Sequence, residues 1–149
     1  MDELVEKMKV LLADTFTLYL KAHGYHWNVI GSDFPQLHDF FGDFYEEVHD
    51  ALDDIAEQVR QLDSFAPGNL TRISELKTLS DDTAIPAAPK MVTNLLDANE
   101  TYLTSLEECY TMAEEMKEFG LSNFLQDRIT AHKKHSWMLK ATAGKKPTQ

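Results

Sequence analysis

The sequence predicts an all-α protein, a bundle of four long helices with one long connection between the second and the third. Apolar residues recur at three- and four-residue steps along four stretches, which is the period of an amphipathic helix. No stretch alternates apolar and polar residues as a half-buried β-strand does. The 149 residues suffice for one sizeable core, so residues 1–149 are expected to form a single domain.

The first two helices are predicted on either side of a short turn. The first covers residues 3 to about 29, and the second runs from Pro35 to about residue 63. Between them, Gly31-Ser-Asp-Phe-Pro35 breaks the helical period; its serine or aspartate is available as an N-cap, and its proline suits a first helical turn. Residues 64–69 should end the second helix. The short turn makes the two helices an antiparallel hairpin.

Residues 70–89 are predicted to be a crossover connection. Pro86 and Pro89 prevent a continuous helix there, which leaves room for one minor helix around residues 73–79.

A third long helix is predicted from Met91 to Phe119, closed by Gly120 as a C-terminal cap. Ser122 is expected to cap a fourth helix. The inner face of that helix is marked by Phe124, Leu125, Ile129, His132, Ser136 and Leu139. Two helices, a crossover and two more helices describe a four-helix bundle with one long connection.

Charge and composition narrow the function classes. The chain has 25 acidic and 14 basic residues, a formal net charge of −11 that attracts cations and repels nucleic acids. Cys109 is the only cysteine, which excludes an internal disulfide framework and fits a reducing compartment. The acidic start and the lack of a long apolar run indicate a soluble, cytoplasmic protein without membrane association.

A cluster of potential metal ligands lies between Ala22 and Arg60. His26 and His38 are almost equally far from the turn, so the hairpin should bring them together. Asp53 and Glu57 are four residues apart on one helix, and their oxygens can converge on one cation. Two imidazoles and two carboxylates suit iron(II), zinc or manganese better than copper(I), which prefers sulfur ligands.

The two pairs of ligands cannot meet within one chain. His38 and Asp53 are 15 positions apart on one helix, which is about 22 Å at 1.5 Å per residue, whereas a metal–ligand bond is about 2 Å. A two-fold dimer, in which the histidines of one chain face the carboxylates of the other, solves the problem and generates two identical sites.

The chain resembles the Dps-type miniferritins, the DNA-binding proteins from starved cells, which belong to the ferritin-like proteins. The resemblance rests on Tyr25-His26-Trp27-Asn28-Val29, Gly31, Phe34, Leu37-His38, Phe41, Tyr45, Asp53 and Ala56-Glu57, and extends to Trp137-Met138-Leu139. It implies a single ferritin-like domain over residues 1–149. It also implies a ferroxidase that assembles as a hollow dodecamer, oxidises iron(II), usually with hydrogen peroxide, stores the ferric mineral and protects against oxidative stress.

The resemblance also implies roles for single residues. His26 and His38 would be iron ligands from one subunit, with Asp53 and Glu57 from its neighbour, in a centre of one or two irons; zinc or manganese could substitute. Trp27 would lie beside the site. One helical turn before His26, His23 is interpreted either as an outer ligand or hydrogen-bond partner, or as a core packing residue.

Some positions depart from the family pattern. Many relatives have an acid one turn after the second histidine, where this chain has Gly42, so a weaker second iron position is expected. Gln58 follows Glu57 in place of the usual arginine, and Arg60 is a candidate ion-pair partner of Glu57. An acid near the start of the last helix, lining an iron-entry pore, is replaced by Asn123, with Asp127 as the nearest substitute.

Simpler interpretations apply to other residues. A histidine at a helix end usually caps or packs, and an Asp-x-x-x-Glu pair is usually solvated; only their combination with the turn favours a metal site. Glu46-x-x-His49 matches a ligand pair of larger ferritins, but no second such motif exists, so an intrachain site is rejected. His132 and His135 are expected at the surface, and Trp137 and the phenylalanines in the core.

Two other functions are alternatives for an acidic helical bundle. A structural, DNA-compacting role needs a mobile basic tail, whereas this chain has an acidic N-terminus and, near its end, only Lys145 and Lys146 after Lys140. DNA binding is therefore not expected. A metal-free helical assembly protein is the third alternative, and metal analysis of the purified protein distinguishes it.

Overall fold

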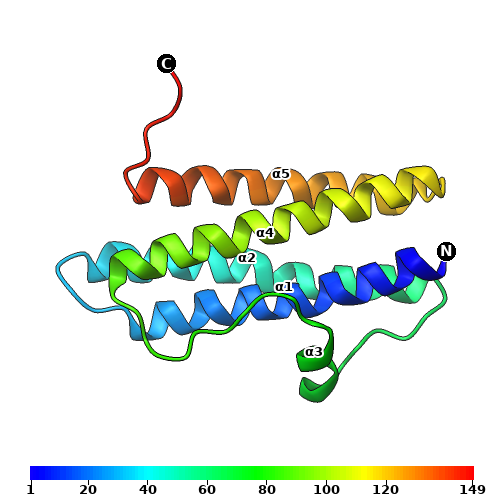
Figure 1. The fold of residues 1–149 in the computed structure, drawn as a ribbon, viewed down its shortest axis with the longest axis horizontal. Helices are drawn as coiled ribbons and strands as arrows, with labels where there is room; N and C mark the ends of the chain where they lie inside the picture. Colours follow the sequence, from blue (N-terminus) through cyan, green and yellow to red (C-terminus); the bar gives the residue numbers. More distant parts are fainter.

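The computed structural model describes residues 1–149 and confirms the all-α bundle with a short helix in the crossover. Figure 1 shows the four long helices lying along one another, with the short helix outside the bundle beside α1. The helices are α1 (Asp2–Asn28), α2 (Phe34–Gln61), α3 (Leu70–Leu76), α4 (Ala88–Glu115) and α5 (Phe119–Thr142). None of them combines the length and apolar character that a membrane crossing requires.

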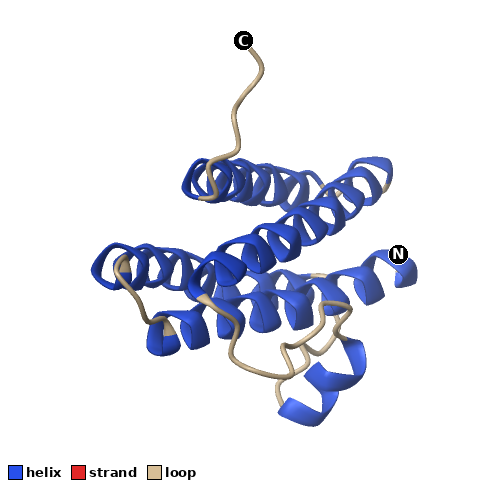
Figure 2. Cartoon of the chain, turned by 60° about the vertical axis from the view of Figure 1, so that its left-hand side comes forward, coloured by secondary structure: helices blue, strands red, loops and turns tan.

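The bundle consists of two antiparallel hairpins. The turn at residues 29–33 joins α1 to α2, and Pro35 lies in the first turn of α2 as predicted, although the N-cap residue Asp33 makes no side-chain capping bond. α4 and α5 form the second hairpin, and α1 packs against α4 to join the two (Figure 2). The predicted hairpin therefore brings the end of α1 next to the start of α2.

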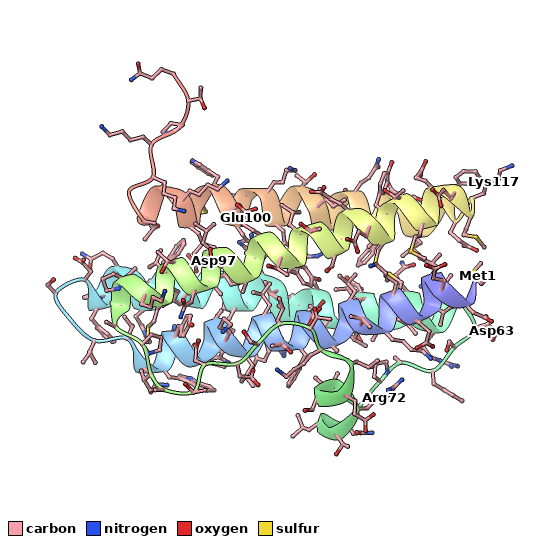
Figure 3. All side chains as sticks on the ribbon, in the orientation of Figure 1. Met1, Asp63, Arg72, Asp97, Glu100 and Lys117 are labelled. Atoms are coloured by element: carbon pink, nitrogen blue, oxygen red, sulfur yellow. The ribbon has the colours of Figure 1, made fainter.

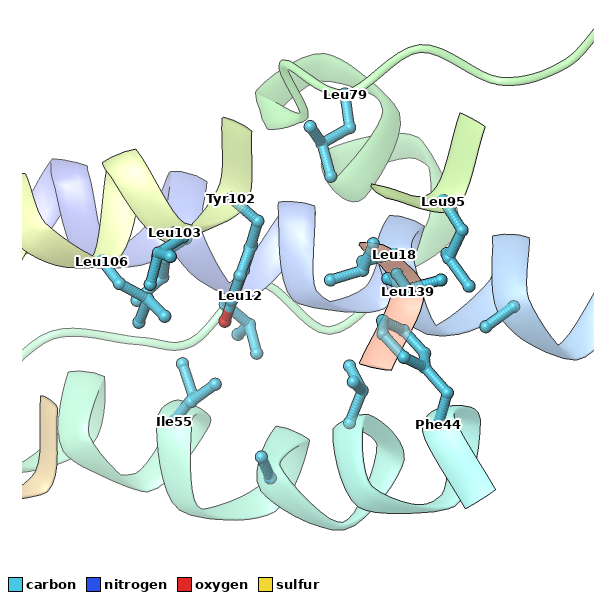
Figure 4. Close-up of a cluster of buried hydrophobic side chains, with 14 of the residues drawn as sticks. Leu12, Leu18, Phe44, Ile55, Leu79, Leu95, Tyr102, Leu103, Leu106 and Leu139 are labelled. Atoms are coloured by element: carbon cyan, nitrogen blue, oxygen red, sulfur yellow. The ribbon is translucent and has the colours of Figure 1, made fainter. Parts of the chain in front are cut away.

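The core lies between the four long helices. Figure 4 shows side chains from α1, α2, α4 and α5, with Leu79 of the crossover, meeting there. The largest fully buried side chains include Met8, Leu11, Leu18, Phe41, Ile55, Leu95, Tyr102, Leu106 and Leu125. Burying each large apolar side chain contributes about 1.5–3 kcal/mol. The polar ends of α1 and α2 are thereby held at fixed positions.

The junction of α4 and α5 differs from the prediction. Gly120 does not cap α4 but lies in the first turn of α5, and Lys117 takes the left-handed conformation with φ 59°. The amide of Glu118 donates to the carbonyl of Ala113, which holds the turn in place without a glycine. Ser122 lies inside α5, where its hydroxyl donates to the Glu118 carbonyl. Both capping predictions were wrong because the turn falls earlier in the chain.

The crossover is anchored to α1 by a buried carboxylate. α3 begins three residues earlier than predicted, because the Asn69 side chain accepts a hydrogen bond from the Arg72 amide and caps it. After α3, the buried Asp14 carboxylate accepts bonds from the amide and hydroxyl of Thr78 and from the amide of Leu79, at 2.7, 2.6 and 3.0 Å. These bonds give partners to two backbone amides and a hydroxyl in a segment that lacks secondary structure.

The surface carries the acidic excess and several large apolar side chains. Figure 3 shows labelled charged residues such as Asp97 and Lys117 on the outer surface of the bundle. Trp137, expected in the core, is 64% exposed, and Phe65 and Phe119 are also exposed. Trp137 follows the buried Ser136 by one position, which rotates it by about 100° away from the inner face of α5.

Candidate metal centre

His26 and His38 lie against each other across the α1–α2 turn. Their rings are stacked, with centroids 3.7 Å apart and planes 17° apart. The Nδ1 of His26 donates to the carbonyl of His38, and the Nδ1 of His38 donates to the carbonyl of His26, both at 2.7 Å. Since a carbonyl only accepts, both rings carry their proton on Nδ1. A neutral imidazole with its proton on Nδ1 keeps the lone pair of Nε2 available, which is the form that binds metals.

Aromatic side chains surround the histidine pair. Phe34 stacks on His38 with ring centroids 5.0 Å apart, and Tyr45 meets His26 edge-on at 5.2 Å. Both histidines are half-buried. The rings are thus held on several sides while their Nε2 atoms make no hydrogen bond within the chain.

Asp53 and Glu57 form the carboxylate pair on α2. Both are exposed, and the Asp53 side chain raises the pKa of the Glu57 carboxyl through a hydrogen bond and then through charge repulsion. The two carboxyl groups therefore lie close enough to interact directly. A divalent cation between them would relieve the repulsion, so the pair fits a cation such as iron(II).

The chain does not join the two pairs. No group of three or more histidine, cysteine, aspartate or glutamate side chains is arranged to hold a metal ion. His38 and Asp53 both belong to α2, about 22 Å apart along its axis. The fold therefore presents two separate half-sites, each with two potential ligands. Their assignment as iron ligands stays a prediction.

His23 belongs to an aromatic cluster beside the histidine pair. Its ring stacks on Tyr45 with centroids 3.8 Å apart and lies 4.0 Å from the ring of Trp27. Its Nδ1 forms a 2.8 Å hydrogen bond with the Tyr19 hydroxyl. Burial, followed by the nearby histidines, lowers the pKa of His23. These contacts fit the packing interpretation of His23, since its hydrogen bond goes to Tyr19 and not to His26 or His38. Trp27 is 58% exposed at the edge of the cluster.

The predicted ion pair between Arg60 and Glu57 is absent. Arg60 instead donates to the carbonyl of Ser64 at 3.1 Å, and its guanidinium lies 4.9 Å from the centre of the Phe65 ring. The left-handed conformation of Asp63, with φ 64°, folds this segment back over Arg60. No ion pair within the chain neutralises Glu57.

A second polar cluster, which we call the Glu47 cluster, joins α2, α4 and α5. It consists of Glu47, Asn99, Arg128, His132 and His135. Arg128 donates to both oxygens of Glu47 and, at 3.0 Å, to the Nε2 of His132. His132 donates from Nδ1 to the amide oxygen of Asn99 at 2.7 Å, and His135 donates to Glu47 at 2.7 Å.

The sequence prediction for this cluster was wrong in part. His132 is fully buried and His135 is half-buried, whereas both were expected at the surface. The signal for His132 was its place on the inner face of α5, four residues before Ser136; the flanking lysines point elsewhere on the helix. Nothing in the sequence indicated that Glu47 and Arg128, 81 residues apart, would pair.

The contacts within the Glu47 cluster shift the pKa values of Glu47 and His132. Burial would raise the pKa of Glu47, but bonds from His135 and Arg128 outweigh it and lower this pKa strongly. Burial, and then the charge of Arg128, lowers the pKa of His132. His132 is therefore a neutral acceptor for Arg128, and both of its nitrogens are occupied. This arrangement leaves no histidine lone pair of His132 for a metal.

Comparison with known proteins supports the class that the fold and the half-sites define. Residues 5–147 match the model of the ferritin-like domain family. An uncharacterized low temperature-induced protein of Nostoc sp. is 32% identical over 132 residues, covering 87% of this chain and 74% of that protein. A DNA protection during starvation protein of Helicobacter pylori is 28% identical over 137 residues, covering 91% of this chain and 95% of that protein.

A solved structure extends the similarity to three dimensions. The Dps protein of Vibrio cholerae, described as a member of a broad superfamily of ferritin-like diiron-carboxylate proteins, is 25% identical with a TM-score of 0.90; the match covers 94% of this chain and 88% of that one. The molecule is thus a ferritin-like four-helix bundle. Within that class, the chain belongs to the Dps-type miniferritins, as the sequence motif predicted.

Proposed function

We propose that this chain is a ferroxidase and iron-storage protein that oxidises iron(II) at sites shared by two subunits. The reciprocal bonding of His26 and His38 carries the proposal. It places the proton of a neutral ring on Nδ1 and leaves the Nε2 atoms of both rings without a partner in the chain, so that they can bind a cation. Two carboxylates that repel each other complete the ligand set from a second chain. Membership of the ferritin-like family supports iron storage and ferroxidase activity at the family level.

The site requires a homo-oligomer. A two-fold axis places the histidine pair of each chain opposite the Asp53–Glu57 pair of the other and makes two equal sites per dimer. Six such dimers would build a hollow dodecamer. At −11 per chain, twelve copies carry about −132 before screening, which concentrates iron(II) around and inside the shell.

The residues have separate tasks in the proposed reaction. His26 and His38 bind iron(II) through Nε2, and Asp53 and Glu57 offset its charge with their oxygens. Four protein ligands at most leave the metal open to the oxidant. Two iron(II) ions supply the two electrons that reduce one hydrogen peroxide, and two protons complete its conversion to two water molecules. Pairing these electrons avoids the release of a hydroxyl radical, which protects the cell from oxidative damage.

The test of the shared site uses two complementary variants. His26→Ala,His38→Ala and Asp53→Asn,Glu57→Gln should each assemble but lose rapid oxidation of iron(II) by peroxide, followed by stopped-flow absorbance. Co-assembly of the two variants should restore about one quarter of the wild-type sites, because half of random dimers are mixed and each mixed dimer has one intact site. Wild-type rates in the double histidine variant, or no recovery on co-assembly, would refute the shared site.

Zinc and manganese should occupy the same ligands without being oxidised by this reaction, and metal analysis of the purified protein tests their presence. DNA binding is not expected, because the net charge of −11 repels the phosphate backbone of DNA. A gel shift at low and moderate salt checks this; a retained shift at moderate salt would contradict it.

A further inference from the structure

Gly42 lies directly against the ring of His26. It is buried on α2, one helical turn after His38. A β-carbon at this position would lie 3.1 Å from Nδ1 and 3.2 Å from Cε1 of His26, closer than ordinary van der Waals contact. The other five glycines have either open space or, at Gly68, an ordinary contact of 3.9 Å. The space of this missing side chain is therefore filled by a candidate ligand.

The His26 ring has little freedom to move away from a new β-carbon. The His38 ring stacks on it at 3.7 Å, and Tyr45 meets it edge-on at 5.2 Å. Its Nδ1, the atom nearest to the added carbon, is also the donor to the His38 carbonyl. A side chain at position 42 would thus push on the hydrogen bond that orients the ring.

Backbone conformation does not explain the glycine. Gly42 is within α2, where glycine is less favourable than alanine, and it does not have a positive φ. Its role is therefore steric and not conformational.

We propose that Gly42 is a positioning residue of the metal site. The absence of its side chain lets the His26 ring lie against the backbone of α2, stack on the His38 ring and donate from Nδ1 to the His38 carbonyl, with Nε2 left free of any partner in the chain. The inference deepens the proposed function, since it treats this pair as metal ligands. Gly42 stands where many relatives have an acidic residue. In this chain the His26 ring occupies the space of that side chain, so the histidine half-site offers only nitrogen ligands.

The experiment uses the full-length assembled protein and zinc, which is not oxidised. Gly42→Ala should lower zinc affinity by about 10–100-fold in calorimetric titrations, the range for residues that orient metal ligands. In metal-free crystals, the His26 Nδ1 of this variant should lie a few tenths of an ångström farther from the His38 carbonyl oxygen than the 2.7 Å of the wild type. Gly24→Ala is the matched control, because Gly24 lies in α1 with no atom within 4 Å of an added β-carbon. Wild-type zinc affinity in Gly42→Ala, or an unchanged His26 bond, overturns the proposal.

A second experiment compares the effect of Gly42→Ala with and without the His26 ring. Alanine at position 42 should lower the thermal midpoint when His26 is present and raise it in a His26→Ala background, where only helix propensity acts. This sign reversal shows that the β-carbon acts through His26 even if the single variant assembles poorly; the same sign in both backgrounds overturns the proposal. These readouts need no iron oxidation, so a wild-type protein that fails to oxidise iron refutes the proposed function alone.

Discussion

The Glu47 cluster and the two half-sites contain similar residues, but their polar atoms differ in whether they have hydrogen-bond partners within the chain. In the cluster, both nitrogens of His132 have partners, and the Glu47 carboxylate is paired with Arg128 and His135. At the half-sites, backbone carbonyls occupy only Nδ1 of His26 and His38. A cluster whose opposite charges are paired within the chain stabilises the bundle, even though the buried Nε of Arg128 has no partner, whereas potential ligands left unpaired can bind a cation or a partner subunit.

Removing the acid from the Glu47 cluster should have the largest effect on stability. Glu47→Ala leaves Arg128, which is 8% exposed, without its counter-charge. We expect a loss of about 3 kcal/mol in the free energy of unfolding, at the lower end for a broken buried pair because Glu47 is partly exposed. Urea denaturation measures it.

The matched control is Glu46→Ala, which removes an exposed acid one position earlier. It should change stability by less than about 0.5 kcal/mol. Equal effects of the two substitutions would show that the cluster is no more stabilising than the solvated surface. The double histidine variant of the half-site should likewise retain its bundle.

The next largest effect should be a loss of stability at low pH that arises in the Glu47 cluster. The pKa of His132 is lowered in the folded chain, so below its ordinary value of 6.5 the unfolded chain takes up a proton that the folded chain does not. Stability should therefore fall as pH drops below 6.5, by at most about 1.4 kcal/mol per pH unit from this residue. The lowered pKa of Glu47 acts in the same direction at lower pH, where its stabilisation is lost.

The measurement compares wild type with His132→Gln between pH 7 and 5. Glutamine does not titrate and can still accept from Arg128, so the slope of stability against pH should be shallower in the variant. Parallel slopes would mean that the buried histidine does not govern the acid response in this range.

A smaller, spectroscopic effect tests whether a partner covers the half-site. Trp27 is 58% exposed in the single chain and lies beside the His23 ring, four residues along α1. In a Trp137→Phe background, where Trp27 is the only tryptophan, assembly should shift its fluorescence to shorter wavelength and reduce quenching by acrylamide. Emission typical of water in the assembled protein would place the partner elsewhere.

Much of the fold followed from periodicity. The apolar repeat located the four long helices within a few residues, and Pro86 and Pro89 marked the crossover. The short turn predicted that His26 and His38 would meet, and the four-residue spacing predicted that Asp53 and Glu57 would interact. Both predictions depend only on residues that are close in the sequence. Their chemistry as ligands remains to be tested.

Other features depended on contacts between distant segments. The Glu47–Arg128 pair joins helices 81 residues apart, and no local pattern specifies it. The left-handed Lys117 replaced the expected Gly120 because hydrogen bonds of the turn stabilise a conformation that sequence preference would assign to glycine.

By itself, the sequence determined which side chains stand one helical turn apart, where the chain turns, and that the histidine and carboxylate pairs are too far apart on α2 to share a metal. Only the tertiary structure decided which polar atoms are used internally and which stay open. The physical reason is that helix geometry is repeated locally, whereas the partner of a hydrogen-bonding atom depends on which helices pack together. His132, paired at both nitrogens, and His26, packed into the space left by Gly42, are the same residue type with different environments.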